Sequence, residues 1–264
     1  MGEFRSSEVV SLVYFVLLAC LAWVAPAPRA ARYGVTGLAL GVWAVTVVAA
    51  HSFAGAVRDW LPLGFLLFAY WSPGSLVTRV NERLERWLVE IDARIFSSFA
   101  GRAALHAPRP VREALELTYA AVYPLVPASL VLILAGGFGE DVDRFWTTVL
   151  VAEYACYGAL PLTATRPPRM IGNGGPVGDS AVRRFNMRVL DGASNGWNTF
   201  PSGHVAGSLA CALAVAAVLP AAGAVLIGLA LLIAVASVVG RYHYAADAVA
   251  GAGVAVLAFV IVWL

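Results

Sequence analysis

The stretch LLIAVASVVGRYHYAADAVAGAGVAVL, residues 231–257, places three charged or chargeable side chains between two apolar runs. They are Arg241, His243 and Asp247. The flanking runs have the character of membrane helices, which need about 20 mostly apolar residues at about 1.5 Å of rise per residue. Because ionisable side chains are costly inside a membrane, their position at this junction indicates a functional site.

The rest of the chain is also apolar. Of its 264 residues, 60% are hydrophobic and 13% are charged, whereas a soluble domain has about 25% charged residues. Helices satisfy their own backbone groups in lipid, so we expect an all-α, polytopic membrane helical bundle with about six core transmembrane helices and six to eight in total. The long apolar windows are residues 9–26, 34–54, 117–136, 145–164, 205–219, 221–239 and 248–264, and the shorter run 61–71 could span, re-enter or lie at the interface.

Charge and cysteine usage exclude several classes of function. The net charge is +2 and all 18 basic residues are arginine, which leaves no long basic face for nucleic acid. Cys20, Cys156 and Cys211 lie in apolar windows at unrelated spacings, so neither a disulfide framework nor a zinc site is indicated.

The segment 77–110 has the pattern of an amphipathic helix at the membrane interface. Leu84, Leu88, Ile91 and Ile95 recur every three or four residues, between arginines and acids that we expect on the wet face. This segment divides the chain into N-terminal transmembrane helices (1–75), an interfacial helix (76–110) and a catalytic helical bundle (111–264).

A polar loop, residues 165–200, is too long to be a simple connection, so we expect it to be functional. If the preceding helix ends on one membrane face, the chain re-enters at Pro201, crosses once, returns, and reaches residues 240–247 on the face of the loop. The polar segments should therefore meet at one surface.

Two of these segments carry residues that could act together on a phosphate group. In Pro201-Ser202-Gly203-His204, Ser202 can cap a helix and Gly203 can admit a ligand close to free amides, which is typical of a phosphate cradle. His204 stands in its first turn. His243 and Asp247 are four residues apart and share a helix face, so the carboxylate can orient the imidazole and leave one nitrogen free to attack.

These residues resemble the type 2 phosphatidic acid phosphatase superfamily over about residues 111–264. Its second motif, Pro-Ser-Gly-His, is intact at 201–204, and its third, Arg followed by His-x-x-x-Asp, is matched at His243 and Asp247. The resemblance implies that His243 forms a phosphohistidine, Asp247 holds it, and His204 protonates the leaving group. Ser202, the Gly203 amide and arginines would stabilise the phosphate, and the resemblance implies no metal or other cofactor.

The arginines depart from the family pattern. The family's first motif needs a lysine, which the chain lacks; Arg166 and Arg169 stand at the usual place, while the pair Arg102 and Arg109 offers an alternative before the wrong helix. In the third motif Ser237 replaces the family arginine. Arg241 can join the site only if the helix that carries His243 and Asp247 starts after it, and Gly240 would permit such a break.

Other polar residues receive no catalytic role. His51 and His106 lack a motif, and Glu153 could be a buried partner of an arginine or a contact between helices. We expect Glu113 and Glu116 in the exposed first turn of a helix.

The sequence thus predicts a membrane phosphatase for a lipid phosphate or diphosphate. Phe-Pro-Ser-x-His-Val-Ala and Tyr-His-Tyr-x-x-Asp look most like the inositol phosphorylceramide synthase branch, so a lipid head-group phosphotransferase is the alternative. An alternative of another class is a non-catalytic scaffold or transporter-like relative. The expected location is the cell membrane, with the site on the extracytoplasmic face, although positive-inside counting of the loop arginines favours the cytoplasm.

Overall fold

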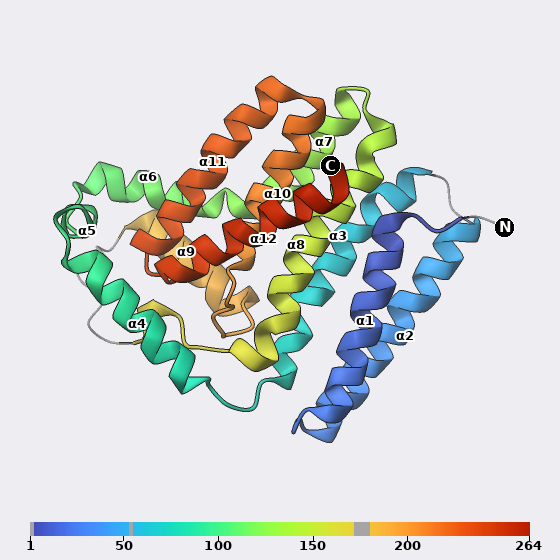
Figure 1. The fold of residues 1–264 in the computed structure, drawn as a ribbon, viewed down its shortest axis with the longest axis horizontal. Helices are drawn as coiled ribbons and strands as arrows, with labels where there is room; N and C mark the ends of the chain where they lie inside the picture. Colours follow the sequence, from blue (N-terminus) through green and yellow to red (C-terminus); the bar gives the residue numbers. More distant parts are fainter. Residues whose placement is uncertain (1–2, 53–54, 172–179) are drawn as a thin grey trace.

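The computed structural model describes residues 3–52, 55–171 and 180–264. Residues 172–179 of the expected functional loop therefore lie outside it. The described residues form an all-helical bundle, which confirms the expected fold class (Figure 1). The helices are α1 Ser6–Val24, α2 Arg29–Ser52, α3 Gly55–Trp71, α4 Glu82–Ser97, α5 Phe99–Leu105, α6 Arg109–Ala120, α7 Val122–Ala135, α8 Val142–Thr163, α9 Ala181–Ala193, α10 Gly203–Val218, α11 Pro220–Val239 and α12 Ala245–Trp263, with short 3₁₀ turns at Pro73–Leu76, Gly139–Asp141 and Pro168–Met170.

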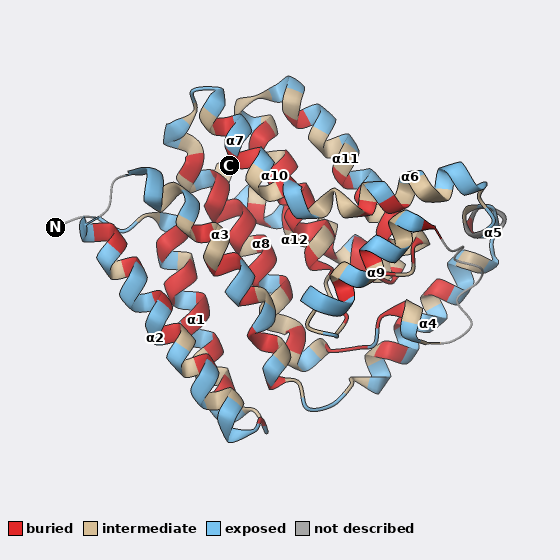
Figure 2. Ribbon diagram, turned by 180° about the vertical axis from the view of Figure 1, so that it is seen from behind, coloured by how far each residue is buried: buried red, intermediate tan, exposed pale blue. Residues whose placement is uncertain are grey.

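The helices α8 and α10 form the centre of the bundle. In α10, 11 of 16 residues are buried, and Figure 2 shows the buried residues concentrated on these two helices and on the adjoining face of α12. Small residues allow this close packing: a Cβ atom on Gly207 of α10 would collide with the carboxyl group of Glu153 on α8. Glu153 is thus an interhelical contact and has no ion pair with an arginine of the described chain.

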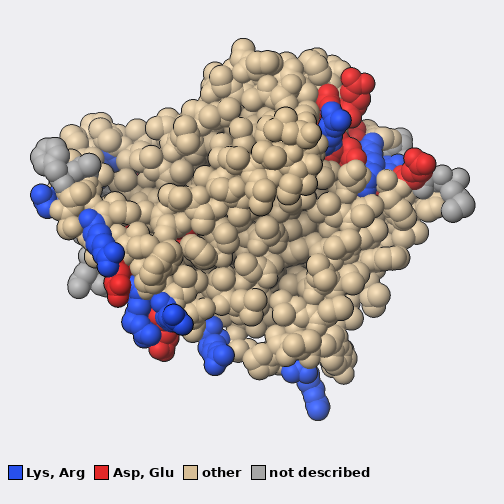
Figure 3. Space-filling model, in the orientation of Figure 1, with Lys and Arg blue, Asp and Glu red and all other residues tan. Residues whose placement is uncertain are grey.

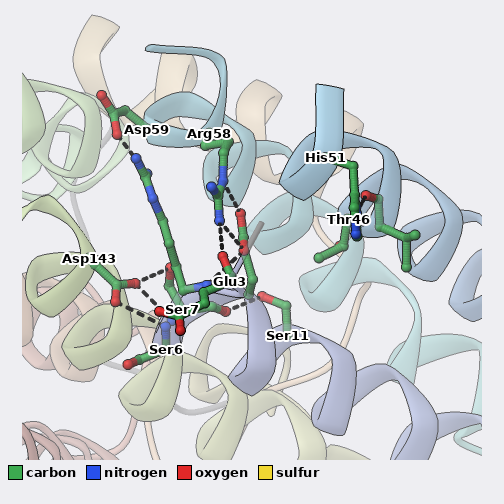
Figure 4. A network of polar contacts seen from close by, with 12 residues as sticks. Glu3, Ser6, Ser7, Ser11, Thr46, His51, Arg58, Asp59 and Asp143 are labelled. Carbon is green, nitrogen blue, oxygen red and sulfur yellow. Dashed lines mark hydrogen bonds and ion pairs between the residues drawn. The ribbon is translucent and has the colours of Figure 1, made fainter. Parts of the chain in front are cut away.

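A polar network fixes the end of the bundle at which α1, α3 and α8 begin (Figure 4). Asp143, next to the start of α8, accepts hydrogen bonds from the first amides of α1, where free N–H groups favour an anion. Two ion pairs connect α1 to α3. The contacts are Ser6 N to Asp143 at 2.9 Å, Ser7 N to Asp143 at 2.9 Å, Arg5 to Asp59 at 2.7 Å and Arg58 to Glu8 at 2.7 Å.

Four described helices are long and apolar enough to cross a membrane, namely α1, α2, α11 and α12, and α6 with α7 would make a fifth although they bend by 55°. This number is below the expected six to eight, because the windows 205–219 and 61–71 form shorter helices and α8 carries charged and polar side chains. Charged side chains gather at two opposite margins in Figure 3, one from α4 to the α1–α2 turn and one near the starts of α3 and α8. The broad uncharged band between them fits a membrane-facing surface.

The hairpin of α10 and α11 is tight because Gly223 has no side chain. A Cβ atom there would collide with the backbone of Ala216, whereas a Cβ atom on Gly228, in the same helix, would meet nothing within 4 Å. This hairpin carries the chain from His204 to His243, so its geometry sets their separation.

Gly223→Val should therefore lower the free energy of unfolding by about 1–3 kcal/mol, the usual cost of overpacking. The check is thermal unfolding of the purified protein in detergent. Gly228→Val is the matched control, since it makes the same change in an open position. Equal melting temperatures for the two variants would contradict the role of the close approach.

Candidate active site

The structure brings the two histidines together. His204 lies in the first turn of α10, and His243 lies in the link between α11 and α12. Nδ1 of His204 is 3.1 Å from Nε2 of His243, although the residues are 39 positions apart. The two motif segments thus meet at one end of the α10–α11 hairpin. This agrees with the prediction that the chain crosses once and returns between them.

The start of α12 holds His243 in place. Asp247 accepts a hydrogen bond from the backbone amide of Tyr244 at 2.9 Å and so caps the helix. The same oxygen lies 3.5 Å from Nδ1 of His243, which has no hydrogen-bond partner among the described residues. The amides of Tyr242 and His243 both donate to the carbonyl of Ser237, at 2.9 and 3.0 Å. Nδ1 therefore faces the carboxylate, and Nε2 faces His204.

A residue of the polar loop holds the side chain of Asp247 in position. The side-chain amide of Asn198 donates to Asp247 at 2.9 Å and to the hydroxyl of Thr165 at 3.0 Å. The Asp247 side chain has no exposed surface. Thr165 and Asn198 also exchange backbone hydrogen bonds, so the two ends of the loop are joined beside the site.

Burial keeps the His243 imidazole neutral. Desolvation, with a smaller contribution from the positive charge of Arg169, lowers the pKa of His243 from its ordinary 6.5 to about 3. A neutral imidazole has one nitrogen with a free lone pair. With Nδ1 directed at Asp247, that nitrogen is Nε2, which fits a nucleophile.

Ser202 and Gly203 occupy the helix start that the sequence predicts. The Ser202 hydroxyl caps α10 by accepting from Val205 N at 3.4 Å, and Ser202 N donates to the carbonyl of Asp247 at 3.0 Å. Gly203 has a packing reason to be glycine, because its Cβ would lie 2.6 Å from the ring of Tyr157. Both residues thus hold α10 against its neighbours.

Three arginines near the site are held by carboxylates. Arg166 binds Glu85 at 2.5 Å, and its side chain is 53% exposed. Arg183 binds Glu116 at 2.7 Å. Arg241 binds Asp92 at 3.0 Å, and its guanidinium lies over the ring of Phe96. None of these guanidinium groups is without an anionic partner.

The helix break required for Arg241 is present. α11 ends at Val239, and Arg241 has a φ of 62°, in the left-handed region that non-glycine residues seldom adopt. The break turns the Arg241 side chain toward α4, where Asp92 holds it. The structure therefore does not bring this guanidinium onto the histidine pair.

Arg169 differs from the other three arginines. It forms no ion pair with a carboxylate of the described chain, and its guanidinium lies over the ring of Tyr242, 6.0 Å from the centroid. Its charge lowers the pKa of His243. Its amide donates to the carbonyl of Arg241 at 3.0 Å, which ties the first motif segment to the third. Of these four arginines, Arg169 is therefore the one most available to bind an anion.

The amphipathic helix α4 differs from the expectation that its arginines and glutamates face water. Glu85 and Asp92 are buried, with 6% and 2% of their surface exposed, because they bind Arg166 and Arg241. Asp92 also accepts the Ala245 amide at 2.9 Å. α4 thus turns one acidic edge toward the site while Arg83, Arg86 and Arg94 remain exposed.

Sequence analysis missed the role of Glu116. It is buried rather than in an exposed first turn, and it accepts from Arg183, from Asn186 at 2.8 Å and from the Tyr242 hydroxyl at 2.5 Å. Tyr242 stacks on Tyr119 with centroids 3.8 Å apart, and Tyr119 stacks on His204 at 5.6 Å. The i, i+3 spacing of Glu116 and Tyr119 was the available signal.

Comparison with known families gives one match. A family model described as the PAP2 superfamily matches residues 86–261, more than half of the chain. The matched segment begins within α4 and contains both histidines. No curated protein and no solved structure matches the chain.

The lowered pKa of His243 makes the stability of the fold depend on pH. Between pH 6.5 and about 3 the unfolded chain binds a proton at this residue that the folded chain does not. The contribution of His243 to stability should therefore be fully present above pH 6.5 and fall as the pH is lowered, by at most about 1.4 kcal/mol per pH unit. Thermal unfolding in detergent from pH 7.5 to 5 should show a shallower slope for His243→Asn than for His51→Asn, an exposed control. Equal slopes would refute the assignment.

Proposed function

The chain belongs to the PAP2 superfamily, and on that premise we propose that it is a membrane-embedded phosphatase that hydrolyses a lipid phosphate or diphosphate through a phosphohistidine. The family supports a phosphatase-type function, and the apolar helices indicate a membrane protein. The observation that carries the proposal is the 3.1 Å approach of His204 and His243, with Asp247 behind His243.

In the first proposed step, Nε2 of His243 attacks phosphorus in line with the leaving oxygen. The N–P bond forms as the P–O bond breaks, and His204 gives its proton to the departing oxygen. A bound phosphate dianion favours the protonated form of His204, because an opposite charge nearby stabilises the cation. In the second step, water loses a proton to His204 and attacks phosphorus. The N–P bond then breaks and orthophosphate leaves.

Charge on the phosphoryl oxygens needs stabilisation, which is usually the largest contribution to such catalysis. Arg169 supplies a cation without a carboxylate partner among the described residues. The N-terminus of α10, with Ser202 and Gly203, supplies a helix dipole. Arg166 and Arg241 can contribute from behind their partners Glu85 and Asp92.

We place the enzyme in the cell membrane with its active site on the extracytoplasmic face. Arg166, Arg183 and Arg241 serve buried carboxylates on the active-site side, so they are weak markers of topology. Intact cells should then hydrolyse a membrane-impermeant phosphate ester. Hydrolysis by inverted vesicles alone would assign the site to the cytoplasmic face.

His243→Asn should abolish the release of orthophosphate from a panel of lipid phosphates and diphosphates in liposomes, because it removes the attacking nitrogen. Wild-type protein should show an acid-labile phosphate on nitrogen, and the variant should not. His51→Asn is the control, since that ring is exposed and contacts its own helix. New phospholipid without orthophosphate would indicate the phosphotransferase instead. Neither product across the panel would indicate a non-catalytic relative.

Arg169→Gln should lower kcat/KM about 100-fold, in the range found when one preorganised donor to a transition state is removed. The matched control is Arg144→Gln, at the opposite end of α8, where the arginine lies 3.9 Å from Asp141. The measurement is steady-state release of orthophosphate. If the two variants have the same kcat/KM, Arg169 does not contact the phosphoryl group.

A further inference from the structure

The ring of His204 has no acidic side chain to orient it, in contrast to the ring of His243. Its polar contact is with Nε2 of His243 at 3.1 Å, and none of the described carboxylates forms a hydrogen bond or an ion pair with it. A general acid must hold its proton within hydrogen-bonding reach of the departing oxygen. The plane of the His204 ring must therefore be set by the side chains that pack against it.

Tyr119, in the last turn of α6, packs against the face of His204. The two rings stack with centroids 5.6 Å apart and an interplanar angle of 30°, within the range in which aromatic rings attract one another. Tyr119 is 1% exposed, so its ring is held in the interior. The face of an aromatic ring also attracts a cation, so this stack favours the protonated imidazole that the first proposed step needs.

Tyr242 completes a stack of three rings with Tyr119 in the middle. Its ring lies 3.8 Å from that of Tyr119, with an interplanar angle of 7°. Its hydroxyl donates to the buried carboxylate of Glu116 at 2.5 Å. Glu116 lies one turn before Tyr119 on α6 and also accepts hydrogen bonds from two side chains of α9. Hydrogen bonds to a carboxylate thus fix one end of the stack, and His204 forms the other end.

We propose that Tyr119 is a positioning residue for the general acid. Its ring, supported by Tyr242 and Glu116, fixes the plane of the His204 imidazole so that the proton of the imidazole meets the leaving oxygen. The inference rests on the phosphatase function proposed above and adds to it a residue of α6, outside both motif segments. Tyr119 acts through His204 and exchanges no proton with the substrate itself.

Substrates that differ in their leaving group report this role. An alkoxide needs a proton as it leaves, whereas a nitrophenolate is stable without one, so the hydrolysis of a nitrophenyl ester depends little on a general acid. Octyl phosphate and an octyl-substituted nitrophenyl phosphate share a chain and differ in this respect. The ratio of their kcat/KM values in one variant does not depend on the fraction of the protein that is folded.

Tyr119→Leu should lower kcat/KM roughly tenfold for octyl phosphate, a part of the roughly 100-fold or more that a general acid supplies, and by less than about twofold for the nitrophenyl ester. Tyr119→Phe keeps the ring and should leave both values close to those of the wild type. Tyr119→Met, which has a flexible side chain without a ring, repeats the test if Tyr119→Leu does not fold. Equal losses on the two substrates would overturn the proposal, and so would equal losses in Tyr119→Phe and Tyr119→Leu.

Tyr154 on α8 provides the matched control. It is 5% exposed and stacks on Tyr14 of α1 with centroids 4.1 Å apart. Tyr154→Leu removes a buried, stacked tyrosine just as Tyr119→Leu does, so both variants should melt at a lower temperature than the wild type. Only Tyr119→Leu should change the ratio of the two kcat/KM values. The same change of ratio in Tyr154→Leu would show that the ratio follows stability and not the position of His204.

A double variant tests whether Tyr119 acts through His204. His204→Asn removes the general acid, so the addition of Tyr119→Leu should lower kcat/KM for octyl phosphate by less than about a further twofold, because residues that act as a unit are not additive. A further loss as large as that caused by Tyr119→Leu alone would show that the two residues act independently.

The two esters also separate this inference from the proposed function. If the wild-type protein hydrolyses both and every Tyr119 variant keeps the wild-type ratio, the phosphatase stands and the positioning role is rejected. If the wild-type protein hydrolyses neither, the proposed function fails and the positioning role fails with it.

Discussion

The Asp247 carboxylate is the interaction on which the site depends. It is buried without a cationic side chain in ion-pair contact, and its stabilisation comes from hydrogen bonds donated by the Tyr244 amide and the Asn198 side chain. The first bond begins α12, and the second fixes the polar loop. The backbone carbonyl of the same residue receives the Ser202 amide and so positions α10. Helix capping, loop closure and orientation of the proposed nucleophile therefore depend on one residue.

Close backbone contact allows this convergence. A Cβ on Gly251 of α12 would collide with the carbonyl of Ser202, and one on Gly207 of α10 would collide with Glu153. Without side chains at these points, three helices approach closely enough for His204 and His243 to meet. The apolar composition explains why these residues are buried, and the glycines allow the short distances between the helices.

The arrangement of the histidines could be predicted from the sequence, and that of the arginines could not. Counting the membrane crossings was enough to bring His204 and His243 to one side of the bundle. The expected helix face shared by His243 and Asp247 is absent, because α12 begins at Ala245 and His243 lies in the link before it. Arg241 pairs with an acid that is 149 positions away. The spacing of residues along α4 does not distinguish an acidic side chain that faces water from that of Asp92, which pairs with an arginine of another segment.

The overall fold, like the site, could be predicted only in part. The helical class and most apolar segments followed from composition and length. The bend between α6 and α7 has a local cause, because Pro124 has no amide to donate to the carbonyl of Ala120. The burial of Glu116, in contrast, depends on Arg183, Asn186 and Tyr242, all distant in sequence.

Helix α4 connects the link that carries His243 to the outer surface of the bundle. Its outer side exposes Arg83, Arg86 and Trp87, while Asp92 on its inner side holds the first amide of α12 and the guanidinium of Arg241. Helix α4 thus holds the link between α11 and α12 from one side. With α4 at the membrane interface, as the sequence predicts, the lateral pressure and charge of the membrane surface would act on α4 and, through Asp92, on the position of the imidazole two residues before Ala245.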